Sequence, residues 1–246
     1  MVYGREGCVS TDMIDAKGEL SVAAVFRLAE NGVTELMGKL KIDGITAKKI
    51  YGAMWVFSKN AVRLIKPLPW GEGYRVESFI TAYSIAKLII ETAVKDLQGA
   101  IVAYAKTELC ALDLQTGRIR KTSSVGIDGS FEKHAPLMDT EFGKFCEDGL
   151  KLIDEVRVRS CDIDFSRHTN NVEYVKFILN TYSVNELLCR PVKQMEIFYI
   201  NQSFENDKLQ VYNFADGSKD FVEIKKGDTA IVRCCIEHYA KENINY

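Results

Sequence analysis

The stretch Arg159–Tyr174, RSCDIDFSRHTNNVEY, is the segment from which the fold of this chain is best deduced. It joins a strand-like run, VRVRS, to a helix-like run, VEYVKFILN, and places two carboxylates, a serine, an imidazole and two amides between them. Polar side chains at the end of a strand, next to the N–H groups that open a helix, are well placed to meet a ligand. The stretch therefore predicts a strand–helix junction and the place where chemistry occurs.

Outward from this junction, the same order of elements occurs twice. After the junction, apolar residues recur at helical spacing from 172 to 187, and strand-like runs follow at 192–204, 208–214, 221–224 and 229–240. In the first half, a helix pattern begins after Ser21, a suitable N-cap, and stops at Gly38. Strand patterns follow at 54–65, 76–82, 88–94 and 101–114. We therefore predict an α+β fold, a tandem (double) hot-dog in which each curved antiparallel sheet wraps around a long central helix.

Residues 115–149 separate the two copies. They contain several glycines among charged and hydroxyl residues and sustain no period of either kind. We predict an N-terminal hot-dog domain at 1–128, a linker at 129–149 and a C-terminal hot-dog domain at 150–246, which carries the polar junction.

Composition excludes several classes of protein. The 246 residues are 47% hydrophobic and carry a net charge of −2, which argues against a nucleic-acid partner. No apolar run is long enough to span a bilayer and the N-terminus lacks a signal-peptide pattern, so we expect a cytoplasmic protein without a membrane partner. The seven scattered cysteines include no CxxC pair and fit reduced, small apolar residues. His238 lies three residues from Cys235, which is too few ligands for a metal site.

Residues 162–174, DIDFSRHTNNVEY, resemble the signature of the plant and bacterial acyl-acyl carrier protein (acyl-ACP) thioesterases, D-x-D-x-N-x-H-x-N-N-x-x-Y. Residues 54–63, and then KPLPWGE at 66–72, resemble that family's W-V-x-x-R strand and Y-P-x-W-G-D turn. LDLQTGR at 112–118 resembles its strand end before the linker. The resemblance implies a tandem hot-dog enzyme of fatty acid biosynthesis and lipid metabolism that hydrolyses fatty acyl-ACP thioesters and releases free fatty acid. It implies no cofactor.

The resemblance also assigns the catalytic residues. The family's Asp and His fall on Asp164 and His168, whereas Ser166 occupies its Asn position, Gln202 its Glu position and Ser203 the place of a Cys. Thioester hydrolysis needs a base or nucleophile, a positioned water and donors for the oxyanion. We expect Asp164 to be the base or nucleophile, with Ser166 and His168 hydrogen-bonding around it. Gln202 can orient a water, but it cannot accept a proton as a glutamate can.

Asn170 and Asn171 open the second helix. Asparagine is a favoured N-cap, so capping alone explains it. The backbone N–H groups near 170–172 are also expected to bind substrate as oxyanion donors.

The acyl chain is expected to lie in the first domain, because residues of that domain line the acyl tunnel in relatives. The candidates are a strand segment and one helix face: Met54, Trp55, Phe57, Val25, Phe26 and Ala29. A tryptophan at Val25 or Met54 is expected to shorten the released acids. Packing within the core is the alternative role for Trp55.

The expected partner is acyl carrier protein with its phosphopantetheine-linked acyl chain. Because that carrier is acidic, a local basic group should receive it. The candidates are Arg118, Arg120 and Lys121, or Lys39, Lys41, Lys48 and Lys49, although such runs also occur as ordinary solvated faces. Assembly into a homodimer is left open.

Two other functions compete with this interpretation. An acyl-CoA thioesterase would keep the chemistry and change the carrier. A non-hydrolytic acyl-thioester-binding protein would explain why Ser166 and Gln202 depart from the family pattern.

Overall fold

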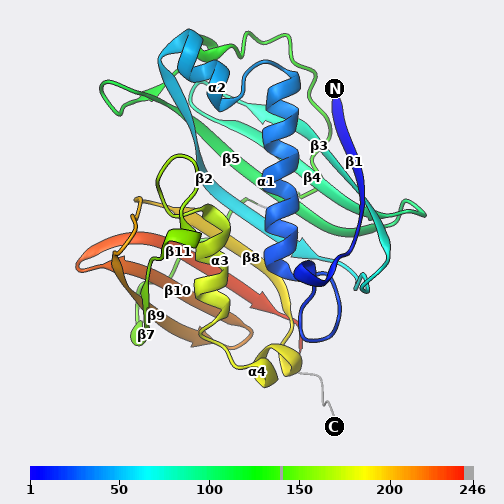
Figure 1. The fold of residues 1–246 in the computed structure, drawn as a ribbon, viewed down its shortest axis with the longest axis vertical. Helices are drawn as coiled ribbons and strands as arrows, with labels where there is room; N and C mark the ends of the chain where they lie inside the picture. Colours follow the sequence, from blue (N-terminus) through cyan, green and yellow to red (C-terminus); the bar gives the residue numbers. More distant parts are fainter. Residues whose placement is uncertain (139–140, 241–246) are drawn as a thin grey trace. The chain divides into compact units, whose positions relative to one another are not determined.

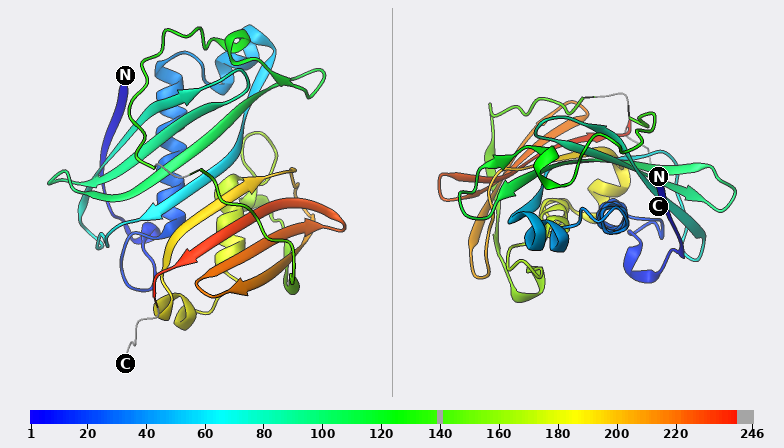
Figure 2. Two further views of the ribbon diagram at one scale, coloured as in Figure 1. Left: turned by 180° about the vertical axis from the view of Figure 1, so that it is seen from behind. Right: turned by 90° about the horizontal axis from the view of Figure 1, so that it is seen from above.

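The computed structural model describes residues 1–138 and 141–240, and the chain divides into two compact units, Met1–Thr140 and Glu141–Tyr246. In each unit an antiparallel sheet carries a helix along one face (Figure 1). Seen from above in Figure 2, the sheet of each unit curls around its own helix. The predicted α+β arrangement of two hot-dog units is confirmed.

The sheet of unit 1 has the strand order β1-β3-β4-β5-β2, with every neighbouring pair antiparallel. The strands are β1 (Val2–Cys8), β2 (Ala53–Leu64), β3 (Gly73–Tyr83), β4 (Leu88–Asp96) and β5 (Ile101–Asp113), and the short β6 (Ile119–Arg120) pairs with β5. The helical segments are η1 (Thr11–Met13), α1 (Val22–Lys39), α2 (Gly44–Thr46), η2 (Ala47–Tyr51) and η3 (Thr122–Val125). The segment between Gly44 and Tyr51 has no counterpart in the sequence prediction.

Helix α1 is the centre of unit 1 and contacts all five long strands. The Ser21 hydroxyl accepts a hydrogen bond from Ala24 N at 3.2 Å and caps the helix as predicted. At Gly32 the helix comes close to β3, because a Cβ there would lie 2.3 Å from Ser78 Oγ. The predicted stop at Gly38 is wrong by a short distance. The helix runs to Lys39, and the chain turns at Lys41, whose φ is 57°.

The sheet of unit 2 has the order β7-β9-β10-β11-β8, again antiparallel. Its elements are β7 (Lys151–Arg157), η4 (Ser160–Asp162), α3 (Asn171–Leu179), α4 (Val184–Cys189), β8 (Val192–Tyr199), β9 (Lys208–Asp216), β10 (Lys219–Lys226) and β11 (Thr229–His238). The predicted continuous helix from 172 to 187 is wrong, because Ser183 and Glu186 form a capping box that starts α4 as a separate helix. The predicted strand at 192–204 ends at Tyr199.

The first parts of the two units repeat one another with a constant offset in residue number. The start of β1 and of β7, and the start of α1 and of α3, are both 149 residues apart. After the helices the offset is 135, since Leu68 O accepts from Leu20 N in unit 1 as Ser203 O accepts from Thr169 N in unit 2. Unit 2 therefore lacks 14 residues between its helix start and this contact. No helix in the described part of the chain is long and apolar enough to cross a membrane.

Candidate active site

The predicted catalytic stretch of unit 2 is a tight loop between η4 and α3. Asp164 N donates to His168 O at 2.9 Å, and Arg167 N donates to Asp164 O at 3.0 Å. The carboxylate takes part as well, because Asp164 Oδ1 accepts from Ser166 N at 2.7 Å. Asp164, Ser166 and His168 are thus brought together in one turn, and no hydrogen bond of the described residues engages the second carboxylate oxygen, Asp164 Oδ2.

His168 is half-buried at the end of this turn. Its ring lies edge-on to the ring of Phe204, with centroids 5.2 Å apart and planes at 71°. Phe165, at the other side of the turn, is 94% exposed. The imidazole is therefore held by an aromatic contact, while its nitrogens are left for other partners.

The equivalent turn in unit 1 has the same backbone. Asp15 N donates to Glu19 O at 2.8 Å, Gly18 N donates to Asp15 O at 3.0 Å, and Asp15 Oδ1 accepts from Lys17 N at 2.8 Å. Both turns contain a residue with positive φ, 74° at Gly18 and 66° at Arg167. The turn geometry of Asp164 is therefore a property of the repeat. Unit 2 differs by the serine and the histidine that follow the aspartate, where unit 1 has a lysine and a glutamate.

Gln202 and Ser203 lie on the segment that pairs with the end of this turn. Gln202 is exposed, and no hydrogen bond to its side chain occurs among the described residues. Ser203 is fully buried, and its hydroxyl lies 2.7 Å from Thr169 Oγ1 and 2.8 Å from Tyr174 Oη. Gln202 and Phe204 flank Ser203 in the sequence, and the Phe204 ring contacts the His168 ring.

The asparagines act at the start of α3. Asn170 is the N-cap, and its Oδ1 accepts from Val172 N at 3.0 Å. Asn170 N in turn donates to Asp162 O at 2.8 Å. Two of the three N–H groups expected to hold an oxyanion already have acceptors, which leaves that of Asn171.

The predicted acyl-binding residues of unit 1 lie on two elements. On α1, Val25, Phe26 and Ala29 are buried. On β2, Trp55 and Phe57 pack against the apolar cluster formed with the C-terminal half of α1, whereas Met54 alternates to the other face of the strand.

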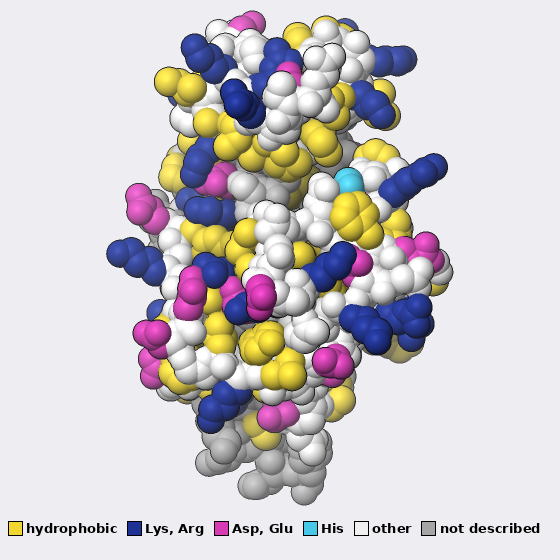
Figure 3. Space-filling view, turned by 90° about the vertical axis from the view of Figure 1, so that its left-hand side faces the viewer, with side chains coloured by type: hydrophobic (Ala, Val, Ile, Leu, Met, Phe, Trp, Pro, Cys, Tyr) yellow, Lys and Arg dark blue, Asp and Glu magenta, His cyan; other side chains and the backbone are white. Residues whose placement is uncertain are grey.

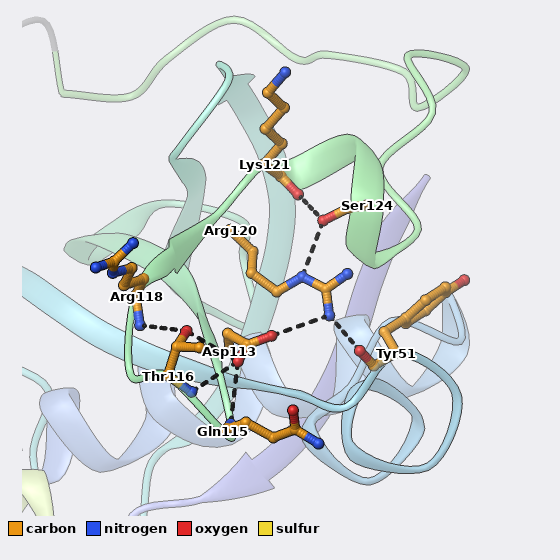
Figure 4. Close-up of polar contacts among 8 residues, drawn as sticks. All are labelled: Tyr51, Asp113, Gln115, Thr116, Arg118, Arg120, Lys121 and Ser124. Carbon is orange, nitrogen blue, oxygen red and sulfur yellow. Dashed lines mark hydrogen bonds and ion pairs between the residues drawn. The ribbon is translucent and has the colours of Figure 1, made fainter.

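The basic residues predicted to receive the carrier differ in their surroundings (Figure 4). The Arg120 guanidinium donates to Tyr51 O and to Ser124 Oγ, the latter at 3.3 Å, and lies 3.8 Å from Asp113 Oδ2. Arg120 is thus committed to the fold, which makes it a poor docking residue, while the exposed Lys121 points away from this cluster. On the face drawn in Figure 3, basic side chains are scattered among acidic and hydrophobic ones.

Unit 2 also contains a buried ionic group that the sequence did not reveal. His238 Nε2 lies 3.0 Å from Asp220 Oδ2, and His238 Nδ1 lies 2.8 Å from Arg190 O. Tyr182 Oη donates to Asp220 Oδ2 at 2.9 Å, and the Arg190 guanidinium lies 3.3 Å from Asp220 Oδ1. Asp220 lies on β10 and His238 on β11, while Tyr182 and Arg190 lie outside the strands. These four residues are spread along the sequence and form no motif, so the sequence alone does not reveal the group.

Comparison with known proteins follows the division into two units. Residues 9–142 match the thioesterase-like superfamily, and residues 147–237 match the acyl-ACP thioesterase C-terminal domain. The chain belongs to the thioesterase-like superfamily. Its second unit carries the acyl-ACP thioesterase C-terminal domain, so the family recognised in the sequence is confirmed and the protein is a thioester hydrolase. A comparison with curated protein sequences found no match.

Solved thioesterase structures share the whole fold. An acyl-ACP thioesterase from Bacteroides thetaiotaomicron is 18% identical, covers 97% of this chain and 98% of its own, and superposes with a TM-score of 0.87. The 12:0-ACP thioesterase from Umbellularia californica is 18% identical, with 98% of each chain covered and a TM-score of 0.86. A putative oleoyl thioesterase from Lactobacillus plantarum is 17% identical, covers 99% and 98%, and has a TM-score of 0.85. Because the sequence identities are low, these structural similarities establish the fold alone.

Proposed function

We propose that this thioesterase hydrolyses fatty acyl-ACP thioesters in the cytoplasm and so ends fatty acid synthesis. The observation that carries the proposal is the match of residues 147–237 to the acyl-ACP thioesterase C-terminal domain, which contains the Asp164–His168 turn. Acyl-CoA hydrolysis is the second candidate, because the superfamily match over residues 9–142 does not depend on the carrier.

Asp164 is the proposed base or nucleophile. As base, its carboxylate takes a proton from water while the water oxygen attacks the thioester carbonyl carbon. The C–S bond then breaks, the thiolate of the carrier takes up that proton, and the fatty acid is released. Ser166 N fixes the carboxylate through Oδ1 at 2.7 Å, and the Ser166 hydroxyl and the His168 ring are the proposed donors to the developing oxyanion.

A panel of thioesters tests the proposal. Purified protein is mixed with C8 to C18 acyl-ACP and the matching acyl-CoA series, and thiol release is followed. Faster release from acyl-ACP at equal chain length supports the proposal. Faster release from acyl-CoA would instead identify an acyl-CoA thioesterase. Tight binding of acyl-ACP without thiol release would identify a non-hydrolytic binding protein.

Restoring a second carboxylate should increase activity. Gln202 is exposed and lies two residues before Phe204, whose ring contacts His168. Because proton transfer by a positioned carboxylate contributes about 10²–10⁴-fold, we expect Gln202→Glu to raise kcat by at least about 10-fold. The measurement is kcat against pH. Gln98→Glu, which adds the same charge at an exposed turn of unit 1, is the control, and equal changes in both variants would remove Gln202 from the site.

Acyl-chain length is proposed to depend on the inner face of β2. Phe57 packs against the apolar cluster beside α1, so Phe57→Trp should shift the released acids toward shorter chains. Val56→Trp, on the opposite face of the strand, is the matched control and should leave the profile unchanged. Gas chromatography of the released acids measures both, and a shift in the Val56 variant alone would place the chain on the other face.

A further inference from the structure

A chain of hydrogen bonds joins Thr169, Ser203 and Tyr174 inside unit 2. Ser203 N donates to Tyr174 Oη at 3.1 Å, and Tyr174 Oη lies 2.8 Å from Ser203 Oγ. Ser203 Oγ lies 2.7 Å from Thr169 Oγ1, which donates to Ser203 O at 3.2 Å. All three residues are buried, and these contacts begin and end on the backbone of Ser203.

Counting donors fixes the direction of each bond in this hydroxyl chain. Tyr174 Oη accepts from Ser203 N, so its own hydrogen is free for Ser203 Oγ. Thr169 Oγ1 gives its hydrogen to Ser203 O, so the hydrogen between Thr169 and Ser203 must come from Ser203 Oγ. Each hydroxyl therefore donates once and accepts once. Bonds arranged head to tail in this way polarise and strengthen one another.

Unit 1 shows that the fold does not need this hydroxyl chain. At the register offsets of the repeat, Leu20 corresponds to Thr169, Val25 to Tyr174 and Leu68 to Ser203. All three counterparts are buried, and Leu20 N still donates to Leu68 O at 2.8 Å. An apolar set thus holds the same backbone contact in unit 1. Buried hydroxyls are costly unless fully satisfied, so their presence beside the turn that carries His168 calls for a role other than packing.

The hydroxyl chain links the two segments of the candidate site. Thr169 directly follows His168, and Ser203 lies between Gln202 and Phe204. Tyr174, in the helix α3, holds both the hydroxyl and the N–H of Ser203. A displacement of Ser203 relative to Thr169 would therefore shift Phe204 relative to the His168 ring; the two ring centroids lie 5.2 Å apart.

We propose that Thr169, Ser203 and Tyr174 are positioning residues that set the distance between the Asp164–His168 turn and the Gln202–Phe204 segment. The proposal rests on the proposed hydrolysis at that turn. Ser203 is not a nucleophile here, because it is fully buried and its hydroxyl is used within the hydroxyl chain. Burial raises the pKa of Tyr174, so its phenol stays neutral as the donor assignment requires.

The test removes one hydroxyl at a time. Tyr174→Phe and Ser203→Ala are each expected to lower kcat by about 10- to 100-fold, the scale of loss when catalytic groups are misplaced. KM should change by less than about two-fold, because the three side chains are buried and hydrogen-bonded to one another. Ser203→Cys, which keeps a group that can donate and accept, should recover part of the kcat lost in Ser203→Ala. The double variant should be little worse than either single variant.

The matched control is Tyr182→Phe, which also removes a tyrosine hydroxyl bond in unit 2, the partly buried one to Asp220 at 2.9 Å. We expect it to lower stability without lowering kcat, when all variants are assayed well below their unfolding temperatures. Amide hydrogen exchange gives a readout that does not depend on activity, since exchange across 162–170 and 202–204 should speed up in Tyr174→Phe and not in Tyr182→Phe. An inactive wild type would overturn the proposed function alone. Unchanged kcat and unchanged exchange in Tyr174→Phe would overturn the positioning role.

Discussion

Asp164→Asn is expected to lower kcat by about 10²–10⁴-fold, because the amide can neither accept a proton nor attack a carbonyl at neutral pH. The substitution keeps the loop, since Asn Oδ1 can accept the same hydrogen bond from Ser166 N that the aspartate accepts at 2.7 Å. Steady-state hydrolysis of the preferred acyl-ACP measures the effect, and the thermal unfolding midpoint confirms that the fold is intact.

The equivalent turn of unit 1 provides an internal control for this experiment. Asp15 occupies the same turn in unit 1 and accepts from Lys17 N at 2.8 Å and from Glu19 N at 3.2 Å. Asp15→Asn makes the same chemical change in the same backbone and should leave kcat unchanged. Equal losses of kcat in both variants would show that each aspartate only stabilises its turn. Full activity in Asp164→Asn would reject Asp164 as base or nucleophile.

Asp220→Ala is expected to destabilise the protein by about 3–5 kcal/mol, because it leaves buried partners of a broken ion pair uncompensated. Asp220 is 1% exposed and His238 is 4% exposed, and Tyr182 and Arg190 also contact the carboxylate. Urea unfolding followed by far-UV circular dichroism measures the loss. Asp216→Ala removes an exposed carboxylate from β9 in the same unit and should change little; a similar change in both variants would refute the assignment.

The same carboxylate predicts how stability depends on pH. Burial by itself would raise the pKa of Asp220, but hydrogen bonds from His238 and Tyr182, and the charges of His238 and Arg190, outweigh it and hold the pKa below its ordinary value of 3.8. A lowered pKa in the folded state stabilises the fold above the unfolded-state value. This contribution is complete above about pH 5 and falls away as the pH drops below about 4 through the folded-state value. The pH dependence in that range should be weaker in Asp220→Ala.

The sequence predicted the repeated units because their elements depend on local patterns. The helical spacing of apolar residues and the Ser21 cap gave α1, and alternating residues gave the long strands. The prediction of a single long helix in the second half was wrong because it used only the spacing of apolar residues. That spacing continues past Ser183, but Ser183 and Glu186 form a capping box that starts a separate helix.

Only those residues of the candidate site that lie together in one sequence segment could be predicted. Asp164, Ser166 and His168 lie within five residues, so a motif reveals them together. Thr169, Ser203 and Tyr174 are brought together by strand pairing and helix placement, and their hydroxyls look ordinary in a linear reading. Aligning the two copies at their helix starts sets Thr169 against Leu20 and Tyr174 against Val25, but only the backbone contact in the structure sets Ser203 against Leu68.

From β1 to the start of α1, each residue of unit 1 has its counterpart 149 residues later in unit 2. The two turns can therefore replace one another. Residues 13–21 and 162–170 have equal length, the same left-handed position and the same exit into a helix. All of the 14-residue length difference falls after that point. Loops can therefore be exchanged between the copies, or a histidine-bearing turn grafted into the first copy, without an insertion, a deletion or a new linker. One half of the chain can thus serve as a scaffold for redesigning the other.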